Sequence, residues 1–397
     1  MKRAFTSIML LTCGLGVLTP AIADNTYTLA VFGDSPYGCK SGECPPDQTI
    51  IKPDSPNGPN PGDPRQIEAT PAFIRAINAD PKVSMVMNVG DIHSGSQYCT
   101  LAYNRTVLNL WRQFKDPLVY TPGDNEWVDC HKTKQGGNVK DSKGDYVDYA
   151  NGNPVANLAL IRQMFFSKPG ETLGVRSKRV ISQAQAYDPA YPKDAEYVEN
   201  VMWEQSDVLF VTLNIPGGSN NDDDSWFGLT KTGEQTQEVA QRTAADIRWL
   251  DAAFEKAKLK GHKAVVIIEQ GDMWDLDGNQ PSHIANYKSF IDSIAANATD
   301  FIKPVLLING DSHYYRSDNP LVNGAPCVTE VAGVETACAN DSYDNQPNGY
   351  AVPNFHRVVV HGAYTPLEYL RLTIHSTLNY ADSDRGFGPF TWTRVNP

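Results

Sequence analysis

The sequence predicts an α/β fold in which mixed β-sheets are layered into a sandwich and flanked by helices. Short apolar runs that suit buried strands alternate with helical segments over much of the 397-residue chain. Strand-like segments follow one another without an intervening helix near the C-terminus, which indicates a partly mixed sheet. Several apolar runs also end abruptly at Gly-Asp, as strands of an α/β sheet do where they reach a functional edge.

The expected strands are short runs of apolar residues closed by turn-forming residues. The stretch that begins at Pro117 is typical, because its apolar run stops at Thr121-Pro122-Gly123. In chain order the expected strands are Tyr27–Phe32, Val83–Asn88, the run from Pro117, the run Val208–Leu213 within Glu204–Ile215, His262–Glu269, Lys303–Asn309, Phe355–His361 and Tyr369–Ser376.

The expected helices carry apolar residues at helical spacing. The longest has Ile247, Leu250 and Phe254 on one face. In chain order the helices are Gln66–Asn78, Leu101–Phe114, Ala156–Phe166, Thr236–Lys258 and His283–Ala295. Polar loops rich in Gly, Pro and Asp are expected over about Ser35–Asp63 and Cys130–Asn153.

The N-terminus has the pattern of a secretory signal peptide. Lys2 and Arg3 precede an apolar region, Ile8–Thr19, and Ala21-Ile22-Ala23 forms a small-residue cleavage site. We expect residues 1–23 to be removed and residues 24–397 to form one domain, exported to the periplasm or the extracellular space. Cys13 leaves a lipoprotein signal as the alternative, and no later segment is long and apolar enough to span a membrane.

The charge of the chain argues against a nucleic-acid partner. The formal net charge is −12, and loss of the two positive charges of the signal peptide leaves −14. An acidic protein is a poor ligand for nucleic acids or anionic membranes. The sequence does not determine the oligomeric state.

Six cysteines remain once Cys13 is set aside, an even number that suits disulfides in an exported protein. Local spacing favours Cys39–Cys44 and Cys327–Cys338, each closing a short loop. Cys99 and Cys130 would then pair and tie two loops together. The alternative, a zinc site, lacks a CxxC pair or nearby His residues.

Five of the expected strands end at a Gly-Asp pair: Gly33-Asp34, Gly90-Asp91, Gly123-Asp124, Gly271-Asp272 and Gly310-Asp311. The carboxyl ends of parallel strands lie along one edge, so these side chains are expected to converge. Packed carboxylates repel one another, and a cation between them removes that cost. The alternative is that each Asp caps a local turn or helix.

The order of these motifs resembles the calcineurin-like metallophosphoesterase family, over about Tyr27–His313. The family pattern is Asp-x-His, Gly-Asp, Gly-Asn-His-Asp/Glu, a lone His after a strand, and Gly-His-x-His. Here Pro36, Asp124, Asn125, Gln270 and Asp311 stand where the family has other residues, mostly His. The retained positions are Asp34, Asp91 and His313.

The resemblance implies one or two divalent metal ions at the strand ends. Asp91, Asp124, Asp311 and Gln270 are the expected ligands of one ion, and Asp34, Asp91 and His313 those of the other. Oxygen ligands favour Mg²⁺, Mn²⁺ or Ca²⁺ over zinc. Such ions would clamp a phosphoryl oxygen and lower the pKa of a bound water.

Other side chains near these motifs are candidates for catalysis or substrate binding. Asn125 takes the position of the family's catalytic His, and His93 or His131 is a candidate replacement for that acid. Arg316 and Glu126 are the expected substrate contacts, Arg316 because a guanidinium can bind phosphate with two hydrogen bonds. The plainer alternatives are loop histidines and a surface salt bridge.

Trp127, Trp274 and Tyr37 follow three strand ends, where they would line either a pocket or the core.

The resulting hypothesis is an exported hydrolase that cleaves a phosphate-ester small molecule with metal-bound hydroxide. The alternative is a non-catalytic relative that uses the same crevice to bind a ligand or partner, since several of the family's His positions are replaced. An unrelated serine esterase is disfavoured because the chain has no Gly-x-Ser-x-Gly motif.

Overall fold

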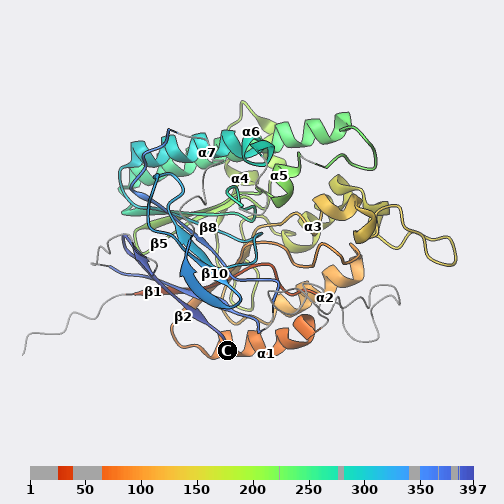
Figure 1. Cartoon of the computed structure of the whole chain (residues 1–397), viewed down its shortest axis with the longest axis horizontal. Helices are drawn as coiled ribbons and strands as arrows, with labels where there is room; N and C mark the ends of the chain where they lie inside the picture. Colours follow the sequence, from red (N-terminus) through yellow and green to blue (C-terminus); the bar gives the residue numbers. More distant parts are fainter. Residues whose placement is uncertain are drawn as a thin grey trace, which may run out of the picture.

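Two β-sheets pack face to face, and helices cover the outer face of each (Figure 1). This computed structural model describes residues 26–38, 65–222, 224–275, 281–338, 349–364, 366–376, 383 and 385–397. The expected signal peptide and the Cys39–Cys44 pair lie outside the described residues. The layered α/β sandwich with mixed sheets is confirmed.

The first sheet has six strands in the order β14-β15-β13-β1-β2-β3. The strands β1, β2 and β3 run parallel, and β13 and β15 add antiparallel neighbours on the far side of β1. Their bounds are β1 Tyr27–Phe32, β2 Val83–Asn88, β3 Leu118–Tyr120, β13 Tyr369–Ile374, β14 Gly386–Phe387 and β15 Phe390–Val395.

The second sheet has nine strands in the order β11-β10-β9-β12-β8-β7-β6-β5-β4. Its centre, β6, β7, β8 and β12, is parallel, and both edges are antiparallel. The bounds are β4 Ile181–Ser182, β5 Val201–Gln205, β6 Val208–Thr212, β7 Ala264–Ile268, β8 Val305–Asn309, β9 Arg316–Asp318, β10 Val328–Val331, β11 Val334–Ala337 and β12 Phe355–Val359.

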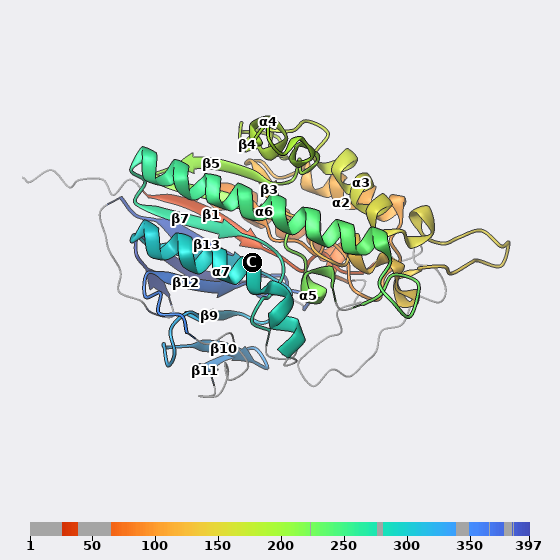
Figure 2. The ribbon, with the colours of Figure 1, turned by 90° about the horizontal axis from the view of Figure 1, so that it is seen from above.

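Seven α-helices and four one-turn 3-10 helices complete the described part of the chain. Figure 2 shows α6 and α7 side by side, and they cover the outer face of the second sheet, while α1 and α2 lie beneath the first sheet in Figure 1. The α-helices are α1 Arg65–Ala79, α2 Leu101–Trp111, α3 Pro154–Phe165, α4 Gln183–Ala186, α5 Gly217–Asn221, α6 Gly233–Lys260 and α7 Pro281–Phe301. The 3-10 turns are Val128–His131, Thr133–Gln135, Tyr149–Gly152 and Pro192–Glu196.

The alternation of side chains along β1 explains the layers. Leu29 and Val31 point into the core between the two sheets, whereas Ala30 and Phe32 point to the core beneath α1 and α2. A strand presents successive side chains to opposite faces, so an entirely apolar strand is buried on both. The first sheet therefore stands between two hydrophobic layers.

Several predicted boundaries need correction. The segment Glu204–Ile215 begins inside β5, which forms a hairpin with β6. Ser206 and Asp207 adopt positive φ angles of 52° and 58° and make the tight turn that hairpins favour. Helix α2 ends at Trp111, short of the predicted Phe114. Helix α6 runs longer than predicted, from its cap at Thr232 to the left-handed Gly261.

The C-terminal strands β9, β10, β11, β14 and β15 were not predicted. The strands β9, β10, β11 and β14 are short, with two to four residues each, and β10 and β11 leave most of their residues partly or fully exposed. The six-residue β15 alternates apolar with polar residues, so it forms no continuous apolar run. The predicted disulfides Cys99–Cys130 and Cys327–Cys338 are both present. None of the helices in the described part of the chain is long and apolar enough to cross a membrane.

Candidate metal centre

The turns after β1, β2, β7 and β8 meet at one edge of the sandwich. Backbone hydrogen bonds join them directly: the Asp34 N–H donates to the Gly90 carbonyl at 3.0 Å, and the Gly310 N–H donates to the Gln270 carbonyl at 3.0 Å. The Asp311 N–H in turn donates to Asp34 Oδ1 at 3.0 Å, across the two sheets. The convergence expected from the five Gly-Asp pairs is therefore present for these turns.

Asp34, Asp91 and His313 form a compact group of potential ligands. One atom from each lies within 4.8 Å of the others, and His313 Nε2 is 3.8 Å from Asp34 Oδ1. Both aspartates are buried, while the His313 side chain keeps 26% of its surface exposed. The group is thus closed on the protein side and open at the imidazole.

The backbone at these positions is unusual. Asp34, Asp91, Asp311 and His313 all have positive φ, at 47°, 54°, 74° and 66°. Residues with a Cβ rarely adopt this conformation, and such strain is concentrated at functional sites. Four of the expected ligands are therefore held in conformations that packing or function has to maintain.

Glycines give the carboxylates the room they occupy. A Cβ on Gly123 would lie 2.0 Å from Asp91 Oδ1, and one on Gly310 would lie 2.5 Å from Asp34 Oδ2. Any side chain at either glycine would therefore displace a carboxylate. This accounts for the Gly of the Gly-Asp pairs at Gly123 and Gly310: each cradles the aspartate of another strand.

The electrostatics of the group are those of an uncompensated anion cluster. Burial raises the pKa of Asp34, Asp91 and Asp311 well above the usual range, and repulsion from Asp124 raises all three further. Desolvation and repulsion from His361 lower the pKa of His313 to about 4. His313 is therefore a neutral imidazole near pH 7, the form that binds metals.

The second predicted ligand set is less closely assembled. Gln270 Nε2 donates to Asp124 Oδ1 at 3.2 Å, while Gln270 Oε1, its ligating atom, accepts the Gly217 N–H at 2.5 Å. Asp311 Oδ2 accepts the Asp272 N–H at 2.8 Å. Asp124, Asp311 and Gln270 thus lie along one wall around the strand ends, and their role as ligands stays a prediction.

Asn125 donates two hydrogen bonds to Asp91. Its backbone N–H donates to Asp91 Oδ1 at 3.1 Å and its Nδ2 donates to Asp91 Oδ2 at 2.7 Å. The Tyr37 hydroxyl completes this contact at 3.3 Å from Asp91 Oδ2 and 3.4 Å from His313 Nε2. Asn125 and Tyr37 therefore orient the central carboxylate, and Tyr37 is buried in the site wall.

The position of Glu126 gives no support to the predicted substrate contact. Its side chain is fully buried, and Oε1 accepts hydrogen bonds from the Tyr120 hydroxyl at 2.6 Å and from the Gly123 N–H at 2.8 Å. Burial raises the pKa of Glu126 to about 7. Glu126 holds the turn that presents Asp124.

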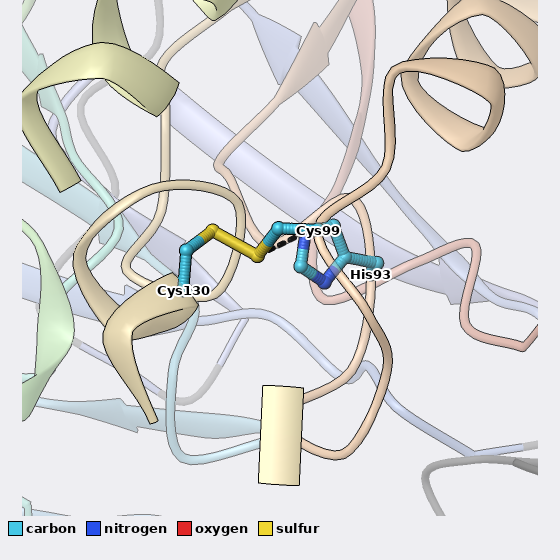
Figure 3. A group of neighbouring side chains, drawn as sticks. All are labelled: His93, Cys99 and Cys130. Atoms are coloured by element: carbon cyan, nitrogen blue, oxygen red, sulfur yellow. Dashed lines mark hydrogen bonds between the residues drawn. A yellow bond between two sulfur atoms is a disulfide. The ribbon is translucent and has the colours of Figure 1, made fainter. Parts of the chain in front are cut away.

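His93 lies behind a disulfide. Figure 3 shows its imidazole against the Cys99–Cys130 bridge, with Nε2 3.7 Å from Cys99 Sγ, and its Nδ1 is 3.3 Å from the Ser94 carbonyl. The three side chains have the spacing of a metal site. Because both sulfurs are committed to the disulfide, neither is the thiolate that a metal needs. His93 is fully buried, so a role as the missing acid gains no support from its position.

His131 and Arg316 also have partners away from the carboxylates. His131 Nδ1 is 2.8 Å from the Val128 carbonyl, and its ring lies edge-on to Phe227. Arg316 Nε is 4.0 Å from the buried Asp318, and Nη2 donates to Thr329 Oγ1 at 3.5 Å. His131 therefore contacts its own loop, and Arg316 contacts side chains of β9 and β10. Because Arg316 is mostly buried, the alternative of a surface salt bridge is wrong.

Trp127 and Trp274 are buried, and they pack in the hydrophobic core.

Two further residues at this edge were not predicted from the sequence. Arg357, in the middle of β12, is fully buried and contacts Asp272, while Ser312 Oγ donates to Asp272 Oδ2 at 2.7 Å. A charged residue inside the run Phe355–Val359 was the available signal for Arg357. Ser312 gave no signal beyond its place between Asp311 and His313.

The residues present fit a divalent cation. Asp34 Oδ2 is buried without a hydrogen-bond partner, next to Asp91 and a neutral imidazole. An unpaired buried carboxylate oxygen is costly, and a cation would satisfy it. Asp34, Asp91 and His313 would hold such an ion.

Comparison with known proteins gives a family match and distant likenesses to solved structures. The calcineurin-like phosphoesterase family model matches residues 27–315. A purple acid phosphatase from seeds of yellow lupin (Lupinus luteus) aligns with 93% of this chain at 11% identity and a TM-score of 0.33. The chain spans about half of that phosphatase, 54% of its length. No curated protein sequence matches the chain.

Proposed function

Since the chain belongs to the calcineurin-like phosphoesterase family, we propose that it is an exported metal-dependent hydrolase of small phosphate esters. The observation that supports the proposal best is the group of Asp34, Asp91 and His313, with its uncompensated carboxylates and one open imidazole. The signal-peptide pattern of residues 1–23 supports export.

A bound metal ion would supply the chemistry, and side chains of the protein would hold and orient its ligands. When bound, a divalent cation supplies Lewis-acid stabilisation of the phosphoryl oxygens and lowers the pKa of a water. Asn125 and Tyr37 hold the Asp91 carboxylate in one orientation. His313 contributes a neutral nitrogen at the exposed side of the group, where a substrate can approach.

Asn125 leaves the site without a proton donor at the position where the family has a catalytic His. A carboxamide does not titrate, so it cannot donate a proton to a leaving group as an imidazolium does. Its Nδ2–H groups already serve Asp91 and Tyr37. We therefore propose substrates whose leaving group departs readily, such as a phenol or another phosphate, over simple alkyl alcohols.

The test is metal analysis of the purified protein, followed by hydrolysis assays with Mn²⁺, Mg²⁺ and Ca²⁺. Aryl and alkyl phosphomonoesters and phosphodiesters form the substrate panel. We expect turnover that chelation abolishes and that is fastest with aryl esters. Absence of turnover with every ion would contradict the proposal, and equal rates for aryl and alkyl esters would contradict only the leaving-group argument.

A non-catalytic binding protein is the second candidate. It is favoured by Asn125, which occupies the place of an acid, and by Gln270, whose Oε1 is directed to a backbone N–H instead of a metal. This candidate predicts retention of a phosphate compound without turnover. Multiple turnovers that are lost in Asp91→Asn would exclude it.

A further inference from the structure

Of the five strand-end aspartates, Asp272 is distinguished by an arginine against its carboxylate. Arg357 Nη1 donates to Asp272 Oδ1, while Arg357 Nε and Nη2 donate to the two oxygens of Asp318 at 2.9 and 2.7 Å. All three side chains are essentially fully buried. The arginine compensates the charge that burial of Asp272 would otherwise leave unpaired.

The other contacts of Asp272 lead to the turn after β8. Its Oδ2 accepts the Ser312 hydroxyl at 2.7 Å, and its backbone N–H donates to Asp311 Oδ2 at 2.8 Å. Oδ1 also accepts the Trp274 N–H at 2.9 Å. Both oxygens of Asp272 are therefore used within the protein, and both neighbours of His313 on its N-terminal side are fixed by this one residue.

The turn that Asp272 holds is the one that completes the metal group. The Asp311 N–H donates to Asp34 Oδ1 at 3.0 Å, and His313 lies two residues further on. Asp311 and His313 both have positive φ, a conformation that needs support from the surroundings. A contact on Ser312, between them, is well placed to give that support.

We propose that Asp272, anchored by Arg357, is a positioning residue that holds the Asp311–His313 turn in its metal-binding conformation through Ser312. Asp272 thus differs in role from Asp34 and Asp91 although its sequence motif is the same. The inference rests on the metal-binding part of the proposed function. It does not require that the protein hydrolyse a phosphate ester.

The test is the affinity of the full chain for Mn²⁺, measured by calorimetry for Ser312→Ala and Ser312→Thr. Outer residues that orient metal ligands typically change affinity by about 10- to 100-fold, so Ser312→Ala is expected to bind Mn²⁺ about 10- to 100-fold more weakly. Ser312→Thr keeps the hydroxyl and is expected to restore binding.

Ser293→Ala is the matched control. Ser293 Oγ donates to the exposed Asp251 at 3.2 Å on the outer helices, so this variant loses a Ser–Asp hydrogen bond remote from the site. It is expected to bind Mn²⁺ like the wild type. Ser312→Ala leaves the buried Asp272 Oδ2 without its hydroxyl donor, so its metal-free thermal midpoint should lie below that of Ser293→Ala. Mn²⁺ affinity is therefore measured at a temperature at which both variants are fully folded, which separates positioning from general stability.

Asp272→Asn is a second variant that acts on the residue itself, and weaker Mn²⁺ binding by its folded form is expected. Wild-type affinity in Ser312→Ala would overturn the proposal. If the wild type binds no Mn²⁺, this inference and the proposed function fall together. If it binds Mn²⁺ without hydrolysing any ester, only the proposed function falls.

Discussion

Two groups of buried carboxylates lie at the same edge of this sandwich and are treated differently. Asp272 and Asp318 share Arg357, which bridges them with charge-assisted hydrogen bonds. Asp34 and Asp91 lie beside Asp124 and Asp311, and no lysine or arginine among the described residues forms an ion pair with any of these four. Asp272 and Asp318 are thus compensated by Arg357, whereas Asp34 and Asp91 would be compensated by a cation bound from solution.

The difference distinguishes acids that look identical in sequence: Asp272 is paired within the fold, whereas Asp34 and Asp91 are the proposed metal ligands. A buried carboxylate needs a compensating charge, and an arginine in the fold supplies it permanently. Where the fold supplies none, burial and repulsion raise the pKa of Asp34 and Asp91. Removing a charge should therefore have opposite effects on metal-free stability in the two groups.

The largest expected effect is that of Asp91→Asn on activity. Loss of the central ligand should lower kcat/KM by roughly 10³-fold or more, because a metal supplies several kcal/mol and each 1.36 kcal/mol is tenfold. Metal-free stability should not fall, since one repelling charge is removed. Steady-state assays and urea unfolding measure both; a large loss of metal-free stability would break the comparison. Asp251→Asn, an exposed site with the same charge change, is the control.

Arg357→Met tests the other group. It leaves Asp272 and Asp318 buried without their cation, so the free energy of unfolding should fall by about 3–5 kcal/mol. The control is Arg371→Met, because Arg371 pairs with Asp80 nearer the surface and keeps 27% of its side chain exposed. That variant should lose about 1 kcal/mol or less. Equal losses in urea unfolding would show that Arg357 has no special role.

Divalent metal should stabilise the wild type. A ligand at about 100 times its Kd adds ~2.7 kcal/mol to the free energy of unfolding, provided that it binds only the folded state. Thermal unfolding with and without Mn²⁺ measures this gain. The gain should persist in Arg371→Met and vanish in Asp91→Asn; a gain that survives in Asp91→Asn would place the metal elsewhere.

The smallest effect concerns Asp148, a buried carboxylate outside both groups. Burial raises its pKa to about 8, partly opposed by the Cys99 backbone N–H. The folded state thus holds this proton more tightly than the unfolded state does, so stability falls as the pH rises from about 4 towards 8. Titration of one proton changes the free energy of unfolding by about 1.4 kcal/mol per pH unit at most, and by roughly 1 kcal/mol between pH 7 and 8.

Asp148→Asn should remove this component of the pH dependence, measured as the difference from the wild type in urea unfolding at pH 6, 7 and 8. Asp145→Asn changes an exposed carboxylate in the same loop and should leave the slope unchanged. A slope that is identical in the wild type and Asp148→Asn would refute the assignment.

Much of the central fold is readable from the sequence. The strands Tyr27–Phe32 and Val83–Asn88 were predicted to the residue, because strands buried on both faces are continuous apolar runs. The predicted helices were found with shifted ends. The exposed C-terminal hairpin of β10 and β11 was not predicted. Its strands are mostly exposed, so they contain no apolar run, and they form because they pair with neighbouring strands.

The site was readable in part. Local motifs identified the Asp residues at the strand ends and His313, since a turn after a buried strand has a recognisable composition. The same motifs assigned Glu126 and Arg316 to a substrate and offered His93 as a catalytic acid. Those assignments needed the side-chain environment: the Tyr120 hydroxyl against Glu126, the disulfide against His93 and Asp318 near Arg316.

By itself, the sequence determined the layered α/β architecture, the Cys327–Cys338 disulfide and the set of strand-end acids, because each depends on local pattern or spacing. The Cys99–Cys130 disulfide followed by elimination. Only the tertiary structure decided which acid has which role. Asp272 and Asp91 follow strands in the same Gly-Asp motif, yet Arg357 meets one and Asn125 the other. The charge that surrounds a buried carboxylate comes from residues distant in the chain, so only the folded protein specifies it.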